Sequence, residues 1–208
     1  MDHASAWQAM WQAFGVQHPN PQLLAQLLAR WAEPHRKYHS TEHLNACLRH
    51  FAQMQQAAER PHEVQMALWF HDAVYELGRA DNEQRSADWA RDAMLAAGID
   101  ADVAQRVHAL VTVTRHDCAP TTQDAEVLLD IDLAILGQPG RVFERYEAQI
   151  ADEFAAVPLA QRRSRRRAIL QQFLDRPHIY HTALFHSLYE AQARANLAWS
   201  IGRLGDDS

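Results

Sequence analysis

Trp69-Phe70-His71-Asp72 places an adjacent histidine and aspartate inside a strongly apolar stretch of the chain. A helix over residues 61–75 puts His71 on the same apolar stripe as Val64 and Leu68, with Asp72 one position further round. Burying even a neutral polar group without a partner costs roughly 2–7 kcal/mol. A bound cation, an arginine or ordinary core hydrogen bonds can each supply that partner, and the dipeptide alone leaves all three open.

The rest of the chain has a helical pattern. Glycine and proline number only 7 and 8 in 208 residues, and Ala, Leu, Gln, Arg and Glu dominate stretches with a period of 3.6. Pro21 and Pro61 suit first helical turns, Gly98 suits a helix end, and Gly137-Gln138-Pro139-Gly140 predicts a turn. We therefore predict an all-α protein with helices at Ser5–Phe14, Pro21–Ala32, Thr41–Ala58, Pro61–Tyr75, Asn82–Ala97, Ala101–Thr114, Asp124–Leu136, Arg141–Ala155, Leu159–Asp175 and His181–Trp199.

Composition excludes several classes of protein. The formal charge of -6 argues against a general nucleic-acid binder. The run Arg162–Arg167 wraps around more than one helix face, so we interpret it as a solvated helix start. Cys47 and Cys118 form no C-x-x-C pair, which suggests neither a disulfide framework nor a thiolate zinc site. No signal-like N-terminus and no apolar span of ~20 residues is present, so we expect a cytoplasmic protein without membrane contact.

Thirteen histidines are available as metal ligands, and two of them lie four residues apart. If a helix has already begun at His39, the rings of His39 and His43 project from the same side. If Ser40 is the N-cap instead, His39 lies just outside the helix and leans over its first turn. Either histidine alone is also consistent with an ordinary surface residue near a helix start.

Two aspartates interrupt an otherwise apolar helix, Val127-Leu128-Leu129-Asp130-Ile131-Asp132-Leu133. Asp132 shares a stripe with Leu128 and Ile131, so we expect it to be the more buried of the two. An arginine partner in the core would explain it equally well. The carboxylate that this helix would contribute to a site is therefore Asp132 or Asp130, with Asp132 favoured.

Together, His43, His71, Asp72 and Asp132 would project two imidazoles and two carboxylates inward from separate helices. This set resembles the HD superfamily of metal-dependent phosphohydrolases, whose fingerprint is a His, a later His-Asp doublet and a distal Asp. The match spans Tyr38 through Leu136. The segments Arg36-x-Tyr-His39, Asn82-Glu83-x-x-Ser86-Ala and Tyr189-Glu190-x-x-Ala-Arg194 are also similar to a bacterial group of uncharacterised HD-domain proteins.

The resemblance implies a fold and a set of ligands. The fold is an HD-type helical bundle, here a single domain over 1–208 with a motif core at 36–136 and the helices of 141–199 packed on it. The implied metal ligands are His43, His71, Asp72 and Asp132, holding one or two divalent ions of Mn, Fe, Co, Ni, Zn or Mg.

Tyr38-His39-x-x-x-His43 is also similar to a cyclic-nucleotide phosphodiesterase motif, which implies His39 as a general acid; that motif carries Asn where this chain has Ser40. Glu76, one helical turn beyond Asp72 if the helix continues, is a candidate proton acceptor. Arg36, Lys37 and Arg115 are candidate phosphate clamps, because an acidic protein that handles an anion needs local cations. His116 is a candidate for a phosphate or second-metal role, and equally for a capping histidine.

The leading expectation is a phosphohydrolase that uses metal-activated water on a phosphoester or phosphoanhydride of a small molecule, with a nucleotide as the favoured substrate. The alternatives are an HD-type di-iron oxygenase and a non-catalytic module that senses a nucleotide. Substrate identity and oligomeric state have no diagnostic motif.

Overall fold

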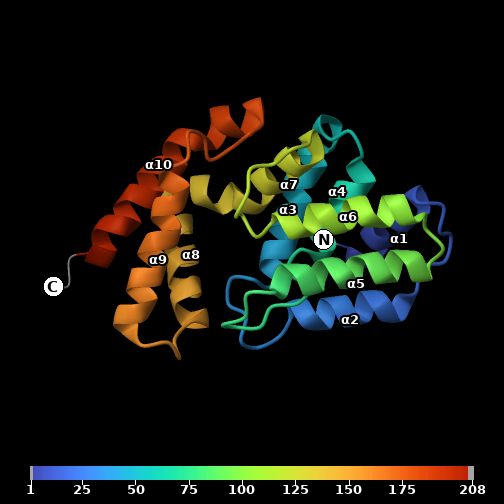
Figure 1. Cartoon of the computed structure of the whole chain (residues 1–208), viewed down its shortest axis with the longest axis horizontal. Coiled ribbons are helices and arrows are strands. Elements are labelled where there is room, and N and C mark those ends of the chain that lie inside the picture. Colours follow the sequence, from blue (N-terminus) through green and yellow to red (C-terminus); the bar gives the residue numbers. More distant parts are fainter. Residues whose placement is uncertain (1, 206–208) are drawn as a thin grey trace. The chain divides into compact units, whose positions relative to one another are not determined.

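The computed structural model describes residues 2–205, and these residues are helical without a β-strand (Figure 1). The all-α prediction is confirmed. The helices group into two compact units, one up to Ile131 and one from Asp132 onward. The prediction of one domain over 1–208 stays a prediction, and its range extends beyond the described residues at both ends.

The first unit contains seven helices among its described residues: α1 (His3–Ala13), α2 (Pro21–Trp31), α3 (Thr41–Met54), α4 (Pro61–Phe70), α5 (Asn82–Ala96), α6 (Ala101–Val113) and α7 (Gln123–Asp132). A short 3₁₀ turn, η1 (Gln55–Ala57), follows α3. Helix α4 is the central element, because it packs against α1, α3, α5 and α6. Its residues Met66 to Phe70 have no exposed surface. The residues that follow α4 therefore start from the middle of the core.

Helix α4 ends at Phe70, although the apolar pattern predicted a helix through Tyr75. His71 is the C-cap, and residues 71–74 form turns. The amide of Ala73 donates to the Phe70 carbonyl at 2.9 Å, a spacing of three residues in place of four. The predicted helical placement of the His71-Asp72 doublet is wrong, although His71 is buried as expected.

Helix α3 begins after Ser40, whose hydroxyl accepts the Glu42 amide at 3.3 Å. Ser40 is therefore the N-cap, and the alternative in which His39 precedes the helix is confirmed. The predicted helix over Asp124–Leu136 is α7 followed by a 3₁₀ segment, η2 (Leu133–Gly137). Asp132 is the last residue of α7, and the division between the two units falls just before it.

The second unit contains η2, α8 (Gly140–Glu153), α9 (Leu159–Leu174) and α10 (Ala183–Gly205). Helix α10 extends beyond the predicted end at Trp199, and it packs against α9 and η2. Asn196 donates to the carbonyls of Leu136 and Gln138, both at 2.8 Å, and the Tyr180 hydroxyl donates to Leu133 at 2.9 Å. These bonds tie the irregular backbone around η2 to the helices.

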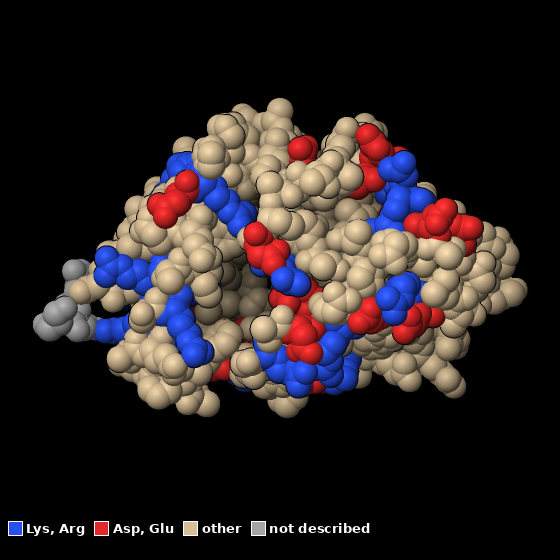
Figure 2. Space-filling model, viewed as in Figure 1, with Lys and Arg blue, Asp and Glu red and all other residues tan. Residues whose placement is uncertain are grey.

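The arginine run of α9 is only partly solvated. Arg165 and Arg167 are exposed, and Figure 2 shows Lys and Arg side chains gathered over α9. Arg166 instead turns inward and pairs with the Glu147 carboxylate and the Tyr146 hydroxyl. Burial opposes its charge, but these two partners raise the pKa of Arg166 above its usual value. The prediction of a solvated helix start is therefore wrong for Arg166.

None of the helices in residues 2–205 combines the length and the apolar character that a bilayer span requires.

Candidate metal centre

Two buried histidines from different helices face each other in the first unit. His43 lies in the first turn of α3, and His71 caps α4. Their Nε2 atoms are 3.1 Å apart, and 3% and 1% of the two side chains is exposed. Two ring nitrogens at this distance, both shielded from water, converge on one point.

The orientation of His71 is determined by its other nitrogen. Nδ1 lies 2.9 Å from the carbonyl of Leu68, which can only accept, so Nδ1 carries the ring proton. Nε2 is then left with a lone pair that points at His43, the usual arrangement of a metal-binding histidine. The buried Trp31 ring packs beside both imidazoles, with centroid distances of 5.3 Å to His71 and 6.2 Å to His43.

Asp72 brings a carboxylate to the same point. Its Oδ2 is 3.2 Å from Nε2 of His71 and 3.8 Å from Nε2 of His43. Only 16% of the Asp72 side chain is exposed. The adjacent histidine and aspartate therefore face one site together.

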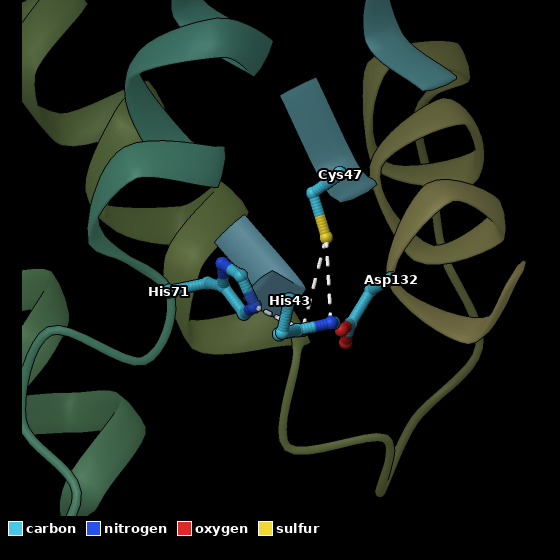
Figure 3. A group of neighbouring side chains, drawn as sticks. All are labelled: His43, Cys47, His71 and Asp132. Carbon is cyan, nitrogen blue, oxygen red and sulfur yellow. Dashed lines mark hydrogen bonds between the residues drawn. The ribbon is translucent and has the colours of Figure 1, made fainter. Parts of the chain in front are cut away.

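Asp132 and Cys47 complete a larger group. His43, Cys47, His71 and Asp132 each offer one ligand atom, and these atoms lie within 4.8 Å of one another. Figure 3 shows the four side chains pointing toward a common region, with Asp132 carried by the end of α7. Cys47 was not among the sequence candidates, although its position four residues after His43 places it on the same face of α3.

Asp132 is less buried than expected. Asp130 has no exposed surface, whereas Asp132 is partly exposed. Almost every residue of α7 from Asp124 to Ile131 is buried, whereas Asp132, the last residue of the helix, is only partly so. The expectation that Asp132 is the more buried aspartate is wrong, but Asp132 is the one that lies with the histidines.

The donor set fits a divalent cation. Two ligands about 2.1 Å from an ion lie about 3.0 Å apart at right angles and about 3.4 Å apart at tetrahedral angles. The distances from Nε2 of His71 to His43 and Asp72, 3.1 and 3.2 Å, fall in this range. Neutral imidazoles and carboxylates are ligands that Mn, Fe, Co, Ni and Zn accept. The site holds its donors near ligand spacing and in a largely buried position.

Arg36 holds the backbone that presents Asp72. Its Nη1 donates to the carbonyls of Asp72 at 2.6 Å and His39 at 3.2 Å, and Nη2 donates to Ala73 at 3.2 Å. Nε donates to the Glu33 carboxylate at 3.1 Å, and none of the Arg36 side chain is exposed. Burial lowers the pKa of Arg36, although the charge of Asp72 opposes this shift. The guanidinium is fully engaged inside the protein, so the phosphate-clamp role predicted for Arg36 does not fit.

The Asn82-Glu83-x-x-Ser86 segment fastens the loop that follows the doublet. Asn82 exchanges two hydrogen bonds with the backbone of Glu76, at 3.1 and 3.0 Å. The Ser86 hydroxyl, which is wholly buried, accepts the amide of Val74 at 3.0 Å. The first residues of α5 therefore replace the hydrogen bonds that a continued α4 would have supplied.

Glu76 is not brought to the candidate metal ligands. Its carboxylate pairs with Arg85 at 2.8 Å, and 45% of the side chain is exposed. The predicted position one helical turn beyond Asp72 is wrong, because no helix connects the two residues. Burial raises the pKa of Glu83, and the charge of Asp72 adds to this shift, whereas Arg115 and His116 lower it.

His39 lies at the edge of the site. Its ring stacks on Tyr75 at 4.3 Å between centroids and lies 6.1 Å from the His43 ring. Its carbonyl is held by Arg36. His39 therefore lies beside the candidate ligands without being one of the residues that converge.

The remaining cationic candidates are more dispersed. Lys37 is exposed, and its Nζ donates to the Pro34 carbonyl at 2.8 Å. Arg115 pairs with Asp117 at 2.5 Å and lines a separate cavity of about 490 Å³ that also contains Cys118 and Arg106. His116 has a positive φ of 58° and lies within electrostatic range of Glu83. The charges of Arg115 and His116 both act to lower the pKa of Glu83, against the effect of burial.

A second histidine group lies in the second unit, where His178, His186 and Glu190 approach one another. The Glu190 carboxylate accepts the amides of Ile179 and Tyr180 and the Nε of Arg194, so its oxygens are already engaged. We assign this group no function.

The chain was compared with family models, curated proteins and solved structures. None of the three comparisons gave a match.

Proposed function

We propose that this protein is a metal-dependent phosphohydrolase that cleaves a phosphoester or phosphoanhydride of a small molecule, with a nucleotide as the favoured substrate. The observation that carries the proposal is the convergence of Nε2 of His43, Nε2 of His71 and Oδ2 of Asp72 within 3.1–3.8 Å. The Asp132 carboxylate at the end of α7 is the fourth donor. The order of these residues along the chain is also the order of the HD fingerprint that the sequence resembles.

Each residue has a distinct part in the proposed reaction. His43, His71, Asp72 and Asp132 would hold the ion, which when bound supplies Lewis acidity that activates water and neutralises phosphoryl charge. A ring nitrogen of His39, supported by Tyr75, would donate a proton to the leaving oxygen. Arg36 orients Asp72 through its carbonyl. Arg115, Lys37 and His116 remain candidates for contact with the rest of a phosphate substrate.

The cellular setting follows from the same proposal. The two cysteines form no disulfide, and a buried thiol lies beside the metal ligands. A reducing compartment such as the cytoplasm keeps this thiol intact. We therefore propose that the protein is cytoplasmic.

The test is metal content together with hydrolysis. The full chain, purified and reconstituted with Mn²⁺, Zn²⁺, Co²⁺ or Mg²⁺, is assayed on a generic phosphodiester and a nucleotide panel. We expect metal-stimulated release of product, and loss of both binding and turnover in His71→Gln and Asp72→Asn. The matched control is His18→Gln, because His18 is exposed and far along the chain from the ligands. Absence of metal binding in the native chain would refute the proposal.

A further inference from the structure

The arginine run of α9 borders a cavity in the second unit. The cavity has a volume of about 600 Å³ and is lined by residues of α8, α9 and α10 (Figure 1). Sites for drug-sized ligands have volumes of roughly 300–1,000 Å³. The charged residues that line the cavity are Glu144, Glu147, Arg162, Arg163, Arg166 and Arg203. Four arginines and two glutamates give the lining an excess of positive charge.

One charged pair forms a fixed wall of this cavity. Arg166 pairs with the Glu147 carboxylate and donates to the Tyr146 hydroxyl at 2.8 Å. The buried hydroxyl of Ser200, in α10, donates to the same carboxylate at 2.7 Å. The charge of Glu147 is therefore balanced by Arg166, and side chains from all three helices are joined at this point.

Two further arginines of the lining are placed to bind an anion. Nη1 of Arg162 donates to the Ala151 carbonyl at 2.9 Å, which fixes the guanidinium without neutralising its charge. Arg203 is exposed and lies over the Trp199 ring, 4.9 Å from the ring centroid. Guanidinium groups bind phosphate through paired hydrogen bonds. Arg162 and Arg203 therefore supply phosphate donors to one cavity.

The same cavity has an apolar side. Trp199 and Leu159 line it, and 39% and 53% of these residues is exposed. An exposed aromatic side chain binds flat rings by stacking. By contrast, Arg165 belongs to the same arginine run but is exposed and does not line the cavity.

We infer that this cavity is a binding site for a small organic phosphate that carries a flat ring and has the size of a nucleotide. Arg162 and Arg203 bind the phosphate, and Trp199 binds the ring. The inference goes beyond the proposed function and does not depend on it. Every residue that lines the cavity belongs to the second unit, and none of them is a candidate metal ligand.

The experiment uses AMP as the probe, titrated by calorimetry into the full-length chain. EDTA in the buffer removes divalent ions from the candidate metal centre. We expect Arg162→Gln and Arg203→Gln each to weaken AMP binding by roughly 10–100-fold, the scale of one hydrogen bond to a charged group. The matched control is Arg165→Gln, which removes the same charge from the same helix outside the cavity and should leave the affinity nearly unchanged.

Ribose 5-phosphate tests the contribution of the ring. We expect the native chain to bind AMP roughly tenfold more tightly than ribose 5-phosphate, since a base gains about this factor by stacking on an aromatic side chain. Trp199→Leu should remove the preference. Circular dichroism shows which variants are folded. If Arg162→Gln does not fold, Arg203→Gln decides the question, because Arg203 is exposed.

Several results would overturn the inference. One is the absence of AMP binding at millimolar concentration. An equal loss of affinity in Arg165→Gln would mean a general attraction to the basic helix, and unchanged affinity in Arg203→Gln would mean that AMP binds elsewhere on the chain. Equal binding of AMP and ribose 5-phosphate would contradict the role of Trp199.

The candidate metal centre provides a separate control. His71→Gln, which should abolish metal binding, should bind AMP in EDTA as tightly as the native chain does. A loss of AMP binding in His71→Gln would assign the nucleotide to the first unit and overturn the inference. Failure of the proposed phosphohydrolase function would leave the AMP measurements unaffected.

Discussion

Arg36 offers the sharpest test of how the site is built. In Arg36→Met, the carbonyls of His39, Asp72 and Ala73 lose their donor, and the Glu33 carboxylate loses a buried partner. Removing one partner from a buried, hydrogen-bonded charge typically costs about 3–5 kcal/mol. At about 2–4 °C per kcal/mol for a chain of this size, the unfolding midpoint should fall by roughly 6–20 °C.

Arg30 provides the control, because it pairs with the same Glu33 carboxylate as Arg36. Arg30 also pairs with Glu33, at 2.8 Å, but 45% of its side chain is exposed. Arg30→Met should therefore cost only about 0–1 kcal/mol. Because Arg36 holds the Asp72 backbone, Arg36→Met should also weaken Zn²⁺ binding by roughly 10–100-fold, which Arg30→Met should not.

Scanning calorimetry and chelator competition measure the two effects, and Arg36→Lys separates charge from shape. A lysine restores one positive charge but cannot reproduce the planar fork that reaches Glu33 and the three carbonyls together, so it should recover only part of the loss. If the free energies of unfolding of Arg36→Met and Arg30→Met differ by no more than about 1 kcal/mol, well below the cost of a broken buried pair, the role assigned to Arg36 is wrong.

Three further predictions follow from single residues. His39→Gln should lower kcat by about 10²–10⁴ while leaving Zn²⁺ affinity unchanged, as expected for a proton donor that is not a ligand; a parallel loss of Zn²⁺ affinity would contradict this role. Gly137→Ala should destabilise the second unit by about 1–3 kcal/mol, because an added Cβ would lie 2.9 Å from the Tyr189 carbonyl oxygen, whereas Gly140→Ala meets no atom within 4 Å and should cost little in urea unfolding. Burial, with the charge of Arg49, lowers the pKa of His50, so the folded state resists protonation of this ring. The stability contributed by the neutral ring is present above about pH 6.5, the usual pKa of a histidine, and is lost as the pH falls below it. His50→Gln should flatten the pH dependence of unfolding in that range, and an unchanged slope would show that His50 does not contribute.

Most of the fold could be predicted because its signals are local. Pro21 and Pro61 are the first residues of α2 and α4, and Asn20 and Ser40 are the N-caps of α2 and α3. Gly98 follows α5 with a positive φ of 80°. The division of the chain into two compact units was not predicted, since it falls at Asp132 inside a continuous apolar stretch with no change in composition. Linkers rich in glycine or proline are the usual sign of such a division, and this one has none.

The ligands were easier to predict than the residues that position them. His71, Asp72 and Asp132 stand out because each is polar in an apolar segment, and burial of such a group calls for a partner, whereas His43 stands out by its spacing of four residues from His39. Arg36 carries no comparable signal. Its sequence neighbours suggest an exposed cation near a helix end, and only tertiary structure brings the carbonyls of Asp72 and Ala73, 36 and 37 residues away, to its guanidinium.

The early end of α4 explains why the side chains of His71 and Asp72 face the same point. Successive residues of a helix project about 100° apart, so a helix through Tyr75 would have turned His71 and Asp72 toward different neighbours. Because the helix ends at Phe70, Nε2 of His71 and Oδ2 of Asp72 approach to 3.2 Å. In the last turn of α4, the carbonyls of Leu68 and Trp69 bond to His71 Nδ1 and Trp31 Nε1 in place of backbone amides, and Arg36 donates to the carbonyls of Asp72 and Ala73 in the turn that follows. The break in the helix, the buried arginine and the paired ligands are therefore one structural solution, in which the hydrogen bonds given up by α4 are replaced so that two adjacent side chains can face the same point.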